Sequence, residues 1–408
     1  MVLSKAKPTS GTVSYLNRHK PCEMFQVQIK DFKNLGVASC IYFFSSNMIS
    51  MFLPVYYVTF GLSISQIAVL LLFTFMIIGL LPITLLRFVR NFERIICLGV
   101  LFTMLFYTLL IYVKNPVVLG VAYGLSIATF WPSFNLLQFR LSESSVRARS
   151  VSLFSIIIPS IASIAGPAFG GLIIEAYGFS AALGLCVALY FVALTFFVLM
   201  KFKRETHGLS IPKGRKVSIF FITFVIFGAS EAYWLAYPLF VNKISETISR
   251  MGFVLAVTGL VVSVITFLVN WLSDIKMRRV EFAMIGVVLN AVWFFLLGLV
   301  SIPQQIVLLS ALSGLASAFT ISWFAHYGDS FSREYYASVL VLMEVGLIIG
   351  RMVNLIPTYI FISKGDYKNY FALLGVLALL NIPFLAYGST FSIAKHEITI
   401  GESDKFDA

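Results

Sequence analysis

Residues 201–216 read KFKRETHGLSIPKGRK, and six of these sixteen residues are Lys or Arg. On both sides of this basic segment the chain is strongly apolar, since 59% of its 408 residues are hydrophobic and only 12% are charged. Soluble proteins carry about 25% charged residues to cover their surface. The sequence therefore predicts an integral membrane protein in which residues 201–216 link two membrane-embedded halves.

The apolar stretches on either side of this linker are long enough to be membrane helices. A helix needs roughly 20 residues to cross the ~30 Å hydrocarbon core. Six such stretches precede the linker and six follow it, at residues 34–59, 64–86, 95–113, 116–138, 150–176, 180–200, 217–241, 250–272, 282–300, 303–326, 335–363 and 369–391. The predicted fold is an all-α membrane protein with twelve transmembrane helices in two pseudo-symmetric six-helix bundles, residues 34–200 and 217–391.

The basic residues predict the orientation of these helices. An even number of spans places the tails, residues 1–33 and 392–408, on the same side of the membrane. That side would carry 24 of the 30 Lys and Arg residues and the other side five, while Arg351 lies within a span. Short loops rich in Lys and Arg stay in the cytoplasm. We therefore expect both termini to be cytoplasmic and the protein to lie in the cell membrane.

Other classes of function find little support in the sequence. The net charge of +12 is spread over short loops instead of forming a nucleic-acid groove. The four cysteines show neither a disulfide framework nor metal-ligand spacing, and there is no phosphate-binding glycine loop. We expect no enzyme activity, no cofactor, no metal and no nucleic-acid partner. The expected partners are a small-molecule substrate, protons and the lipid bilayer, and the protein is expected to be a monomer.

The two halves are related by an offset of 184 residues. This offset superimposes Pro54 on Pro238, Ser65 on Ser249 and Arg94 on Arg278, all at matching positions of their spans. It also places Asn47 of the first span on Glu231 of the seventh. The coincidences predict a duplicated six-helix unit, as found in many transporters.

Residues 270–279, NWLSDIKMRR, resemble the G-x-L-x-D-R-x-G-R-R signature that the major facilitator superfamily carries between its second and third helices. The segment keeps the Leu-Ser-Asp core and the paired arginines, whereas residues 86–95 of the first half have Arg90 where the aspartate belongs. The resemblance implies a gating loop that contains Asp274, Arg278, Arg279 and, in the first half, Arg94. The alternative is an ordinary solvated loop that follows the positive-inside rule.

Residues 162–171, ASIAGPAFGG, are similar to the antiporter signature g-x-x-x-G-P-x-x-G-G of the same superfamily. The resemblance implies a drug:proton antiporter-like transporter, in which Gly166, Pro167, Gly170 and Gly171 prevent leakage during exchange. Small residues at every fourth position also allow helix backbones to approach closely in lipid. Close packing is therefore an equal alternative.

Three ionisable residues, Glu231, Glu344 and Arg351, lie inside predicted spans. A charge at mid-bilayer costs about 2.5–3.5 kcal/mol on insertion scales, so such residues face a cavity or form pairs. Glu231, or failing that Glu344, would load and release a proton while Arg351 pairs with the ionised carboxylate or with an anionic substrate. The alternative is a structural ion pair of Arg351 with one of the two glutamates.

Aromatic and amide residues accompany these charges. Trp131 and Asn135 share one face of the fourth span, and Tyr233 and Trp234 follow Glu231. In the family's fold, spans one, four, seven and ten line the cavity, so the resemblance implies a large, mainly apolar pocket to which Asn47 also contributes. The alternative is the usual enrichment of aromatic residues at membrane interfaces.

The sequence thus predicts a secondary active transporter that works by alternating access. We expect proton-coupled efflux of a small, partly hydrophobic solute. One alternative is proton-linked uptake of an organic anion or sugar, which Arg351 favours. The other is a non-transporting membrane sensor or scaffold with the same fold.

Overall fold

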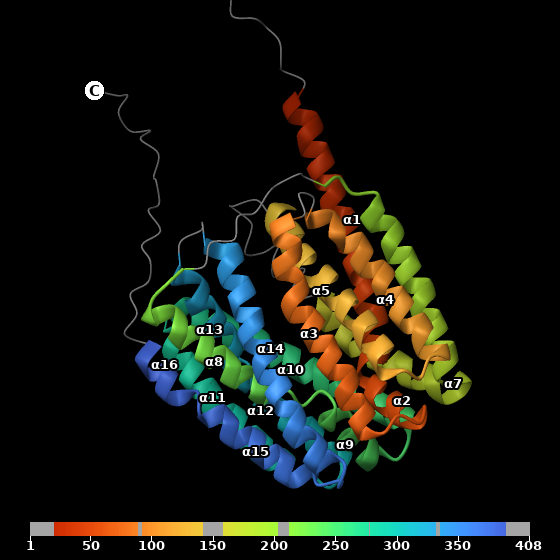
Figure 1. Cartoon of the computed structure of the whole chain (residues 1–408), viewed down its shortest axis with the longest axis vertical. Coiled ribbons are helices and arrows are strands. Elements are labelled where there is room, and N and C mark those ends of the chain that lie inside the picture. Colours follow the sequence, from red (N-terminus) through yellow and green to blue (C-terminus); the bar gives the residue numbers. More distant parts are fainter. Residues whose placement is uncertain are drawn as a thin grey trace, which may run out of the picture.

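The computed structural model describes residues 20–88, 92–141, 158–202, 212–276, 278–331 and 335–388, and the chain is helical throughout these ranges apart from short connections (Figure 1). The first half comprises α1 (Lys20–Ile49), η1 (Ser50–Phe52), α2 (Leu53–Thr59), α3 (Ile64–Phe88), η2 (Phe92–Arg94), α4 (Ile95–Tyr112), α5 (Pro116–Leu141) and α7 (Ile158–Val198). The second half comprises α8 (Arg215–Glu231), α9 (Ala236–Ser245), α10 (Ile248–Lys276), α11 (Arg279–Leu297), α12 (Pro303–Ala316), α13 (Ala318–Asp329), α14 (Tyr336–Ile362), α15 (Tyr367–Leu379) and α16 (Ile382–Gly388).

Eleven helical stretches of the described residues are long and apolar enough to cross a membrane. One of them, Ser160–Val198, contains two predicted spans, because Gly178 (φ 82°, ψ 170°) interrupts α7 between residues 176 and 180. Only glycine adopts such a backbone conformation without strain. The two limbs of α7 therefore account for the fifth and sixth spans, and the predicted all-α fold of twelve helices is confirmed.

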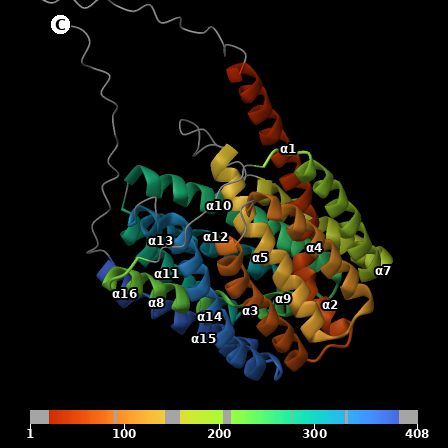
Figure 2. The ribbon, with the colours of Figure 1, turned by 45° about the horizontal axis from the view of Figure 1, so that its top comes forward.

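The predicted tails and linker are described only in part. Residues 1–19 of the N-terminal tail, 203–211 of the linker and the whole C-terminal tail lie outside the described residues. The apolar part of the first span begins at Lys33, one residue before the predicted start at residue 34, but α1 itself begins at Lys20. The start of α1 consequently projects beyond the neighbouring helices (Figure 2).

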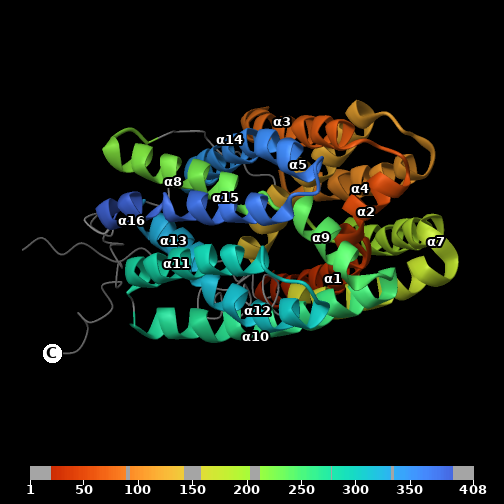
Figure 3. The same cartoon turned by 90° about the horizontal axis from the view of Figure 1, so that it is seen from below.

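The two halves lie side by side and meet along two pairs of long helices. Helix α7 packs along α10, and α3 packs along α14. Seen from below, the first half and the second half occupy opposite ends of the molecule (Figure 3). The short helices α2 and α9 also touch, close to the loops that follow them in the chain. We call this side of the molecule the loop side, and the opposite side, where α1 begins and α16 ends, the termini side.

Glycines make the same helix crossing in each half. A Cβ on Gly99 of α4 would lie 2.7 Å from the Phe130 amide nitrogen of α5. Likewise, a Cβ on Gly286 of α11 would lie 2.2 Å from the Phe319 amide nitrogen of α13. In lipid, small residues at a crossing let two backbones come into contact. The repeat predicted from the sequence is thus present in the packing of the helices.

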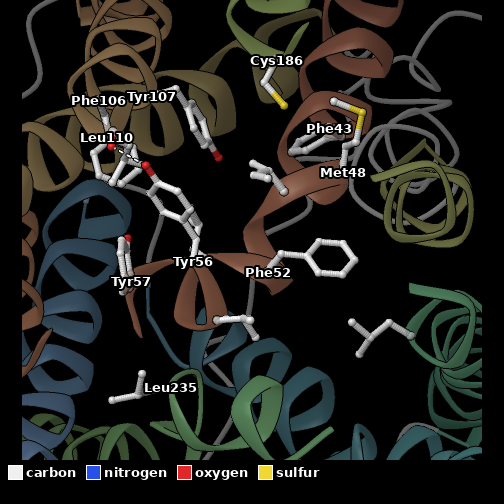
Figure 4. Close-up of a cluster of buried hydrophobic side chains, with 14 of the residues drawn as sticks. Phe43, Met48, Phe52, Tyr56, Tyr57, Phe106, Tyr107, Leu110, Cys186 and Leu235 are labelled. Atoms are coloured by element: carbon white, nitrogen blue, oxygen red, sulfur yellow. Dashed lines mark hydrogen bonds between the residues drawn. The ribbon is translucent and has the colours of Figure 1, made fainter. Parts of the chain in front are cut away.

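Buried apolar residues join the halves on the loop side. One cluster contains Phe52 and Tyr57 of the first half together with Leu235 and Met251 of the second (Figure 4). A separate cluster around Phe220, Trp323 and Tyr327 near the termini side is built from second-half residues alone. Within the described residues, the molecule is therefore closed between its halves on the loop side.

Candidate functional site

The first and seventh spans are interrupted at equivalent positions. Helix α1 gives way to η1 at Ser50 before α2 begins, and α8 ends at Glu231 before α9 begins at Ala236. Pro54 and Pro238 lie just after the two breaks, and proline cannot donate the backbone hydrogen bond that would continue a helix. Broken helices at membrane depth are where many transporters bind substrates and ions.

The break in the seventh span carries an ion pair. Glu231 lies 16 residues from the start and 14 from the end of the span Arg215–Ser245, near its middle. Arg351 of α14 donates a hydrogen bond of 2.7 Å from Nε to Glu231 Oε1, and its Nη2 donates to the same oxygen. Only 14% of the Arg351 side chain and 21% of the Glu231 side chain are exposed. Arg351 thus pairs with Glu231, and the pairing gives each buried charge its counterion.

Trp234 connects this ion pair to the other half. The guanidinium carbon of Arg351 lies 4.5 Å from the centroid of the Trp234 ring, which is within the range of a cation–π interaction. The same ring lies 5.7 Å from the ring of Phe75 in α3, edge to face. The ion pair therefore belongs to the second half but lies at its contact with the first.

Glu344 adds a second carboxylate near the pair. It lies close enough to interact electrostatically with both Arg351 and Glu231, but it forms no hydrogen bond or ion pair with the described part of the chain. Ile348, on the same face of α14, packs against Phe75 of α3. This face of α14 is thus directed toward the first half, and it carries a second carboxylate within electrostatic range of the Glu231–Arg351 pair.

Trp131 and Asn135 of α5 approach the same interface from the first half. Both side chains are exposed, and Trp131 lies 5.6 Å from the ring of Phe43. Ile127, one turn earlier on the same face, packs on the cluster that Phe75 and Ile348 form. Ile127 thus places this face of α5 near the interface, while the roles of Trp131 and Asn135 as lining residues stay predictions.

Two predicted lining residues make contacts within their own half. The Tyr233 ring lies 5.5 Å from both Trp293 and Phe294, and its role in lining a substrate site stays a prediction. The next residue, Trp234, contacts Arg351 and, across the interface, Phe75. Asn47 donates a hydrogen bond of 2.9 Å to the Phe43 carbonyl of its own helix and is only partly exposed.

The predicted gating loop of the second half contains a local ion pair. Arg278 forms an ion pair of 3.3 Å with Glu281 at the start of α11, and both side chains are well exposed. Arg279 is partly buried and Arg94 is exposed. The side chain of Asp274, the acidic residue of the predicted gating loop, lies outside the described residues.

The Gly-Pro segment packs in two directions. A Cβ on Gly170 would lie 1.8 Å from the Met48 carbonyl oxygen, and one on Gly166 would lie 2.8 Å from Asn47 Cβ, so this face of α7 fits directly onto α1. A Cβ on Gly171 would lie 2.9 Å from the carbonyl oxygen of Ile248 in α10, across the interface between the halves. Close packing accounts for the glycines, while a role in preventing leakage stays a prediction.

A buried polar network beside Glu231 is missing from the sequence-based prediction. Asn354, Thr358 and Tyr370 are at most 2% exposed. The Asn354 amide donates to the Ala229 carbonyl, and the Tyr370 hydroxyl lies 2.9 Å from the Ala232 carbonyl oxygen and 2.8 Å from Asn354 Oδ1. Asn354 and Thr358 are polar residues one helical turn apart inside a predicted span, and this spacing could have indicated a polar network from the sequence. No comparable pattern in the sequence points to Tyr370.

Comparisons with known proteins agree with this architecture. A search of curated protein sequences gives no match. Among solved structures, the nucleoside transporter NupG is similar over 88% of this chain and 99% of its own, with a TM-score of 0.69 and 14% identity. An auto-inhibited peptide transporter of the POT family is similar over 90% of this chain and 98% of its own, with a TM-score of 0.73 and 12% identity. At such low identity, these likenesses show the fold alone.

The sequence model of the Major Facilitator Superfamily matches the chain twice, over residues 35–217 and 219–397. The two matches meet next to the basic linker from which the division into halves was predicted. They also agree with the prediction that the protein is a transporter and not an enzyme. The chain belongs to the major facilitator superfamily.

Proposed function

We propose that the protein is a proton-coupled secondary transporter in which Glu231 carries the proton. The observation that carries the proposal is the Glu231–Arg351 ion pair at the break of the seventh span, beside the interface between the halves. A proton on Glu231 removes the counterion of Arg351, and Glu344, which interacts electrostatically with Arg351, is the candidate to replace it. Protonation therefore changes the partner of a buried cation, which couples proton binding to the arrangement of the helices.

The substrate of this proposal is a small, partly hydrophobic solute that leaves the cell in exchange for protons. Trp131 and Trp234 contribute exposed aromatic surface from the two halves, and Trp234 joins this surface to the charged group. With both glutamates ionised, the group of Glu231, Glu344 and Arg351 has a net negative charge. A proton is compatible with that charge, and so is a neutral or cationic solute. Competition between proton and solute for this group favours their exchange across the membrane.

Uptake of an organic anion with a proton is the second candidate, because Arg351 is the only basic side chain in the group. In the unprotonated state Glu231 occupies the guanidinium and Glu344 repels a further anion. An anion would therefore bind only together with a proton. The two candidates thus predict opposite responses to a proton gradient.

The orientation in the membrane is part of the proposal. The basic loops place the termini side in the cytoplasm, so the conformation closed on the loop side is the inward-facing one. A protease site inserted between Ser363 and Asp366 on the loop side should be cleaved in intact cells. A site inserted at Lys213 should be cleaved only after the cells are opened, and the reverse pattern would overturn the orientation.

Transport by Glu231→Gln tests the proton carrier. Solutes that raise the denaturation temperature of the purified protein would be selected first, since a ligand that binds only the folded state stabilises it. In proteoliposomes, an imposed proton gradient should drive the native protein to accumulate the solute on the acidic side of the membrane. The Gln variant should lose this accumulation and retain solute-for-solute exchange.

Glu246→Gln, in an exposed pair with Arg250 of the same half, is the matched control and should behave like the native protein. Gradient-driven accumulation by Glu231→Gln would exclude Glu231 as the carrier. Accumulation on the alkaline side would favour uptake with protons. Binding without any movement of solute would favour the non-transporting sensor.

A further inference from the structure

The carbonyl groups on either side of Glu231 are released by the break in the seventh span. In a continuous helix the Ala229 carbonyl would accept a hydrogen bond from the amide of Tyr233. Here the Tyr233 amide donates to the Glu231 carbonyl at 2.8 Å instead. A buried carbonyl that loses its helical partner needs another donor, particularly inside a membrane.

Side chains of α14 and α15 supply these donors. The Asn354 amide donates to the Ala229 carbonyl, and the Tyr370 hydroxyl lies 2.9 Å from the Ala232 carbonyl oxygen. Thr358 Oγ1 lies 2.8 Å from Asn354 Oδ1 and 2.9 Å from the Tyr370 hydroxyl. Each hydroxyl has one proton. Donation by Tyr370 to Ala232 and by Thr358 to Asn354 Oδ1 satisfies every member of the network.

This network holds the backbone of Glu231 to the helix that provides its counterion. Asn354 follows Arg351 by three residues on α14, which is about 4.5 Å along the axis. Helix α14 thus contacts Glu231 through Arg351 and the preceding Ala229 through Asn354. A displacement of α14 against α8 would move the counterion and the backbone of the carboxylate together.

The first half breaks its helix without such a network. The 184-residue offset places Gly170, Ile174 and Cys186 at the positions of Asn354, Thr358 and Tyr370. Of these, Cys186 donates from Sγ to the Ser45 carbonyl at 3.3 Å, a weak hydrogen bond at the position that corresponds to Ala229. The interruption of a span therefore does not itself require three buried polar side chains. Among the described residues, such a network accompanies the break that carries a charge and not its equivalent in the first half.

We infer that Asn354, Thr358 and Tyr370 are positioning residues, which hold the break of the seventh span so that the Glu231 carboxylate faces Arg351. The role in proton exchange rests on the proposed function, whereas the geometric role can be measured without transport. Tyr370→Phe removes one hydroxyl and keeps the ring, and Thr358→Val removes the other at nearly constant volume.

The test measures the coupling between Glu231 and Arg351 in different backgrounds. Thermal denaturation midpoints of the native protein, Glu231→Gln, Arg351→Gln and the double variant give the non-additive part of their effects. In a Tyr370→Phe background this coupling should fall by half or more, and Thr358→Val should act in the same direction. Thr358→Ser, which keeps the hydroxyl, should retain the native coupling.

Cys186→Ala, which removes the equivalent contact in the first half, is the matched control and should leave the coupling unchanged. A lower denaturation temperature in Tyr370→Phe with unchanged coupling would show a merely structural network and would overturn the inference. If Tyr370→Phe does not fold, the comparison of Thr358→Val with Thr358→Ser decides the same question. The inference stands even if Glu231→Gln still transports against a gradient, an outcome that contradicts only the proposed function.

Discussion

At the scale of single residues, Arg351 has the contacts that a buried cation requires. Nε and Nη2 both donate to one oxygen of Glu231, and the guanidinium lies over the ring of Trp234. A planar guanidinium can make these contacts at once, whereas the ammonium group of a lysine cannot reproduce them. The three residues come from two helices and the segment between α8 and α9, so the ion pair stabilises their arrangement.

We predict that removing one charge of this pair lowers the stability of the protein more than removing both charges. Breaking a buried ion pair by removing one partner costs about 3–5 kcal/mol, whereas replacing both partners by apolar residues is often neutral. Arg351→Leu should therefore lower the thermal denaturation midpoint strongly, and Glu231→Leu combined with Arg351→Leu should recover part of the loss. Arg278→Leu, in an exposed pair, should cost less than about 1 kcal/mol. A double variant less stable than Arg351→Leu would contradict the prediction.

At the scale of elements, helices of this protein meet through glycines and broken ends. Helices α1 and α8 correspond to each other under the repeat, and the helices packed on them correspond as well. A Cβ on Gly170 of α7 would collide with the Met48 carbonyl oxygen of α1, and a Cβ on Gly350 of α14 would lie 2.0 Å from the Val225 carbonyl oxygen of α8. These contacts leave no room for a methyl group, so the backbones themselves determine the distance between the helices.

We predict that Gly170→Ala destabilises the protein and Gly184→Ala does not. The two glycines lie in α7, but a Cβ at Gly184 would meet nothing within 4 Å, whereas at Gly170 it would lie 1.8 Å from a carbonyl oxygen. Forcing a methyl group into a packed crossing costs about 1–3 kcal/mol. At Gly184 the better helix propensity of alanine should leave stability unchanged or slightly raised. Denaturation temperatures of the two variants would be compared, and equal values would refute the packing account.

At the scale of the whole molecule, the two halves are held together on the loop side by apolar and polar contacts. Besides the buried cluster around Phe52 and Leu235, Glu175 of α7 accepts a hydrogen bond of 2.7 Å from the Ser249 amide. Ser249 lies in the first turn of α10, where amide groups lack helical partners and carry partial positive charge. A carboxylate of one half thus caps a helix of the other, and opening on the loop side must break this contact.

We predict that Glu175→Ala shifts the population toward conformations open on the loop side. Spin labels at Val58 of α2 and Lys243 of α9, in a background without native cysteines, would report the distance between the halves by pulsed electron resonance. The Ala variant should show a larger fraction of long distances than the native protein. Glu246→Ala, which removes a residue paired with Arg250 of its own half, is the control and should leave the distribution unchanged. Identical distance distributions for the two variants would show that the Glu175–Ser249 contact does not hold the loop side closed.

The number of spans, their division by a basic linker and the repeat could all be predicted from the sequence. The bilayer demands a certain length of apolar chain at each crossing, and this demand acts on each segment separately. The offset between the halves also aligned Asn47 with Glu231 at the two broken spans. The break between the fifth and sixth spans was also predicted, at residues 177–179, and the structure shows that Gly178 makes the turn there.

The sequence by itself thus determined the fold class and identified the ionisable residues Glu231, Glu344 and Arg351 inside spans. Both results follow from the local composition of the chain. Only the tertiary structure decided that Arg351 pairs with Glu231 and not with Glu344, and that Trp234 reaches the interface. It alone brought Asn354 and Tyr370 to the carbonyls beside Glu231. These outcomes depend on how far each helix is rotated about its axis and where it breaks. Contacts between helices more than a hundred residues apart in the chain set both.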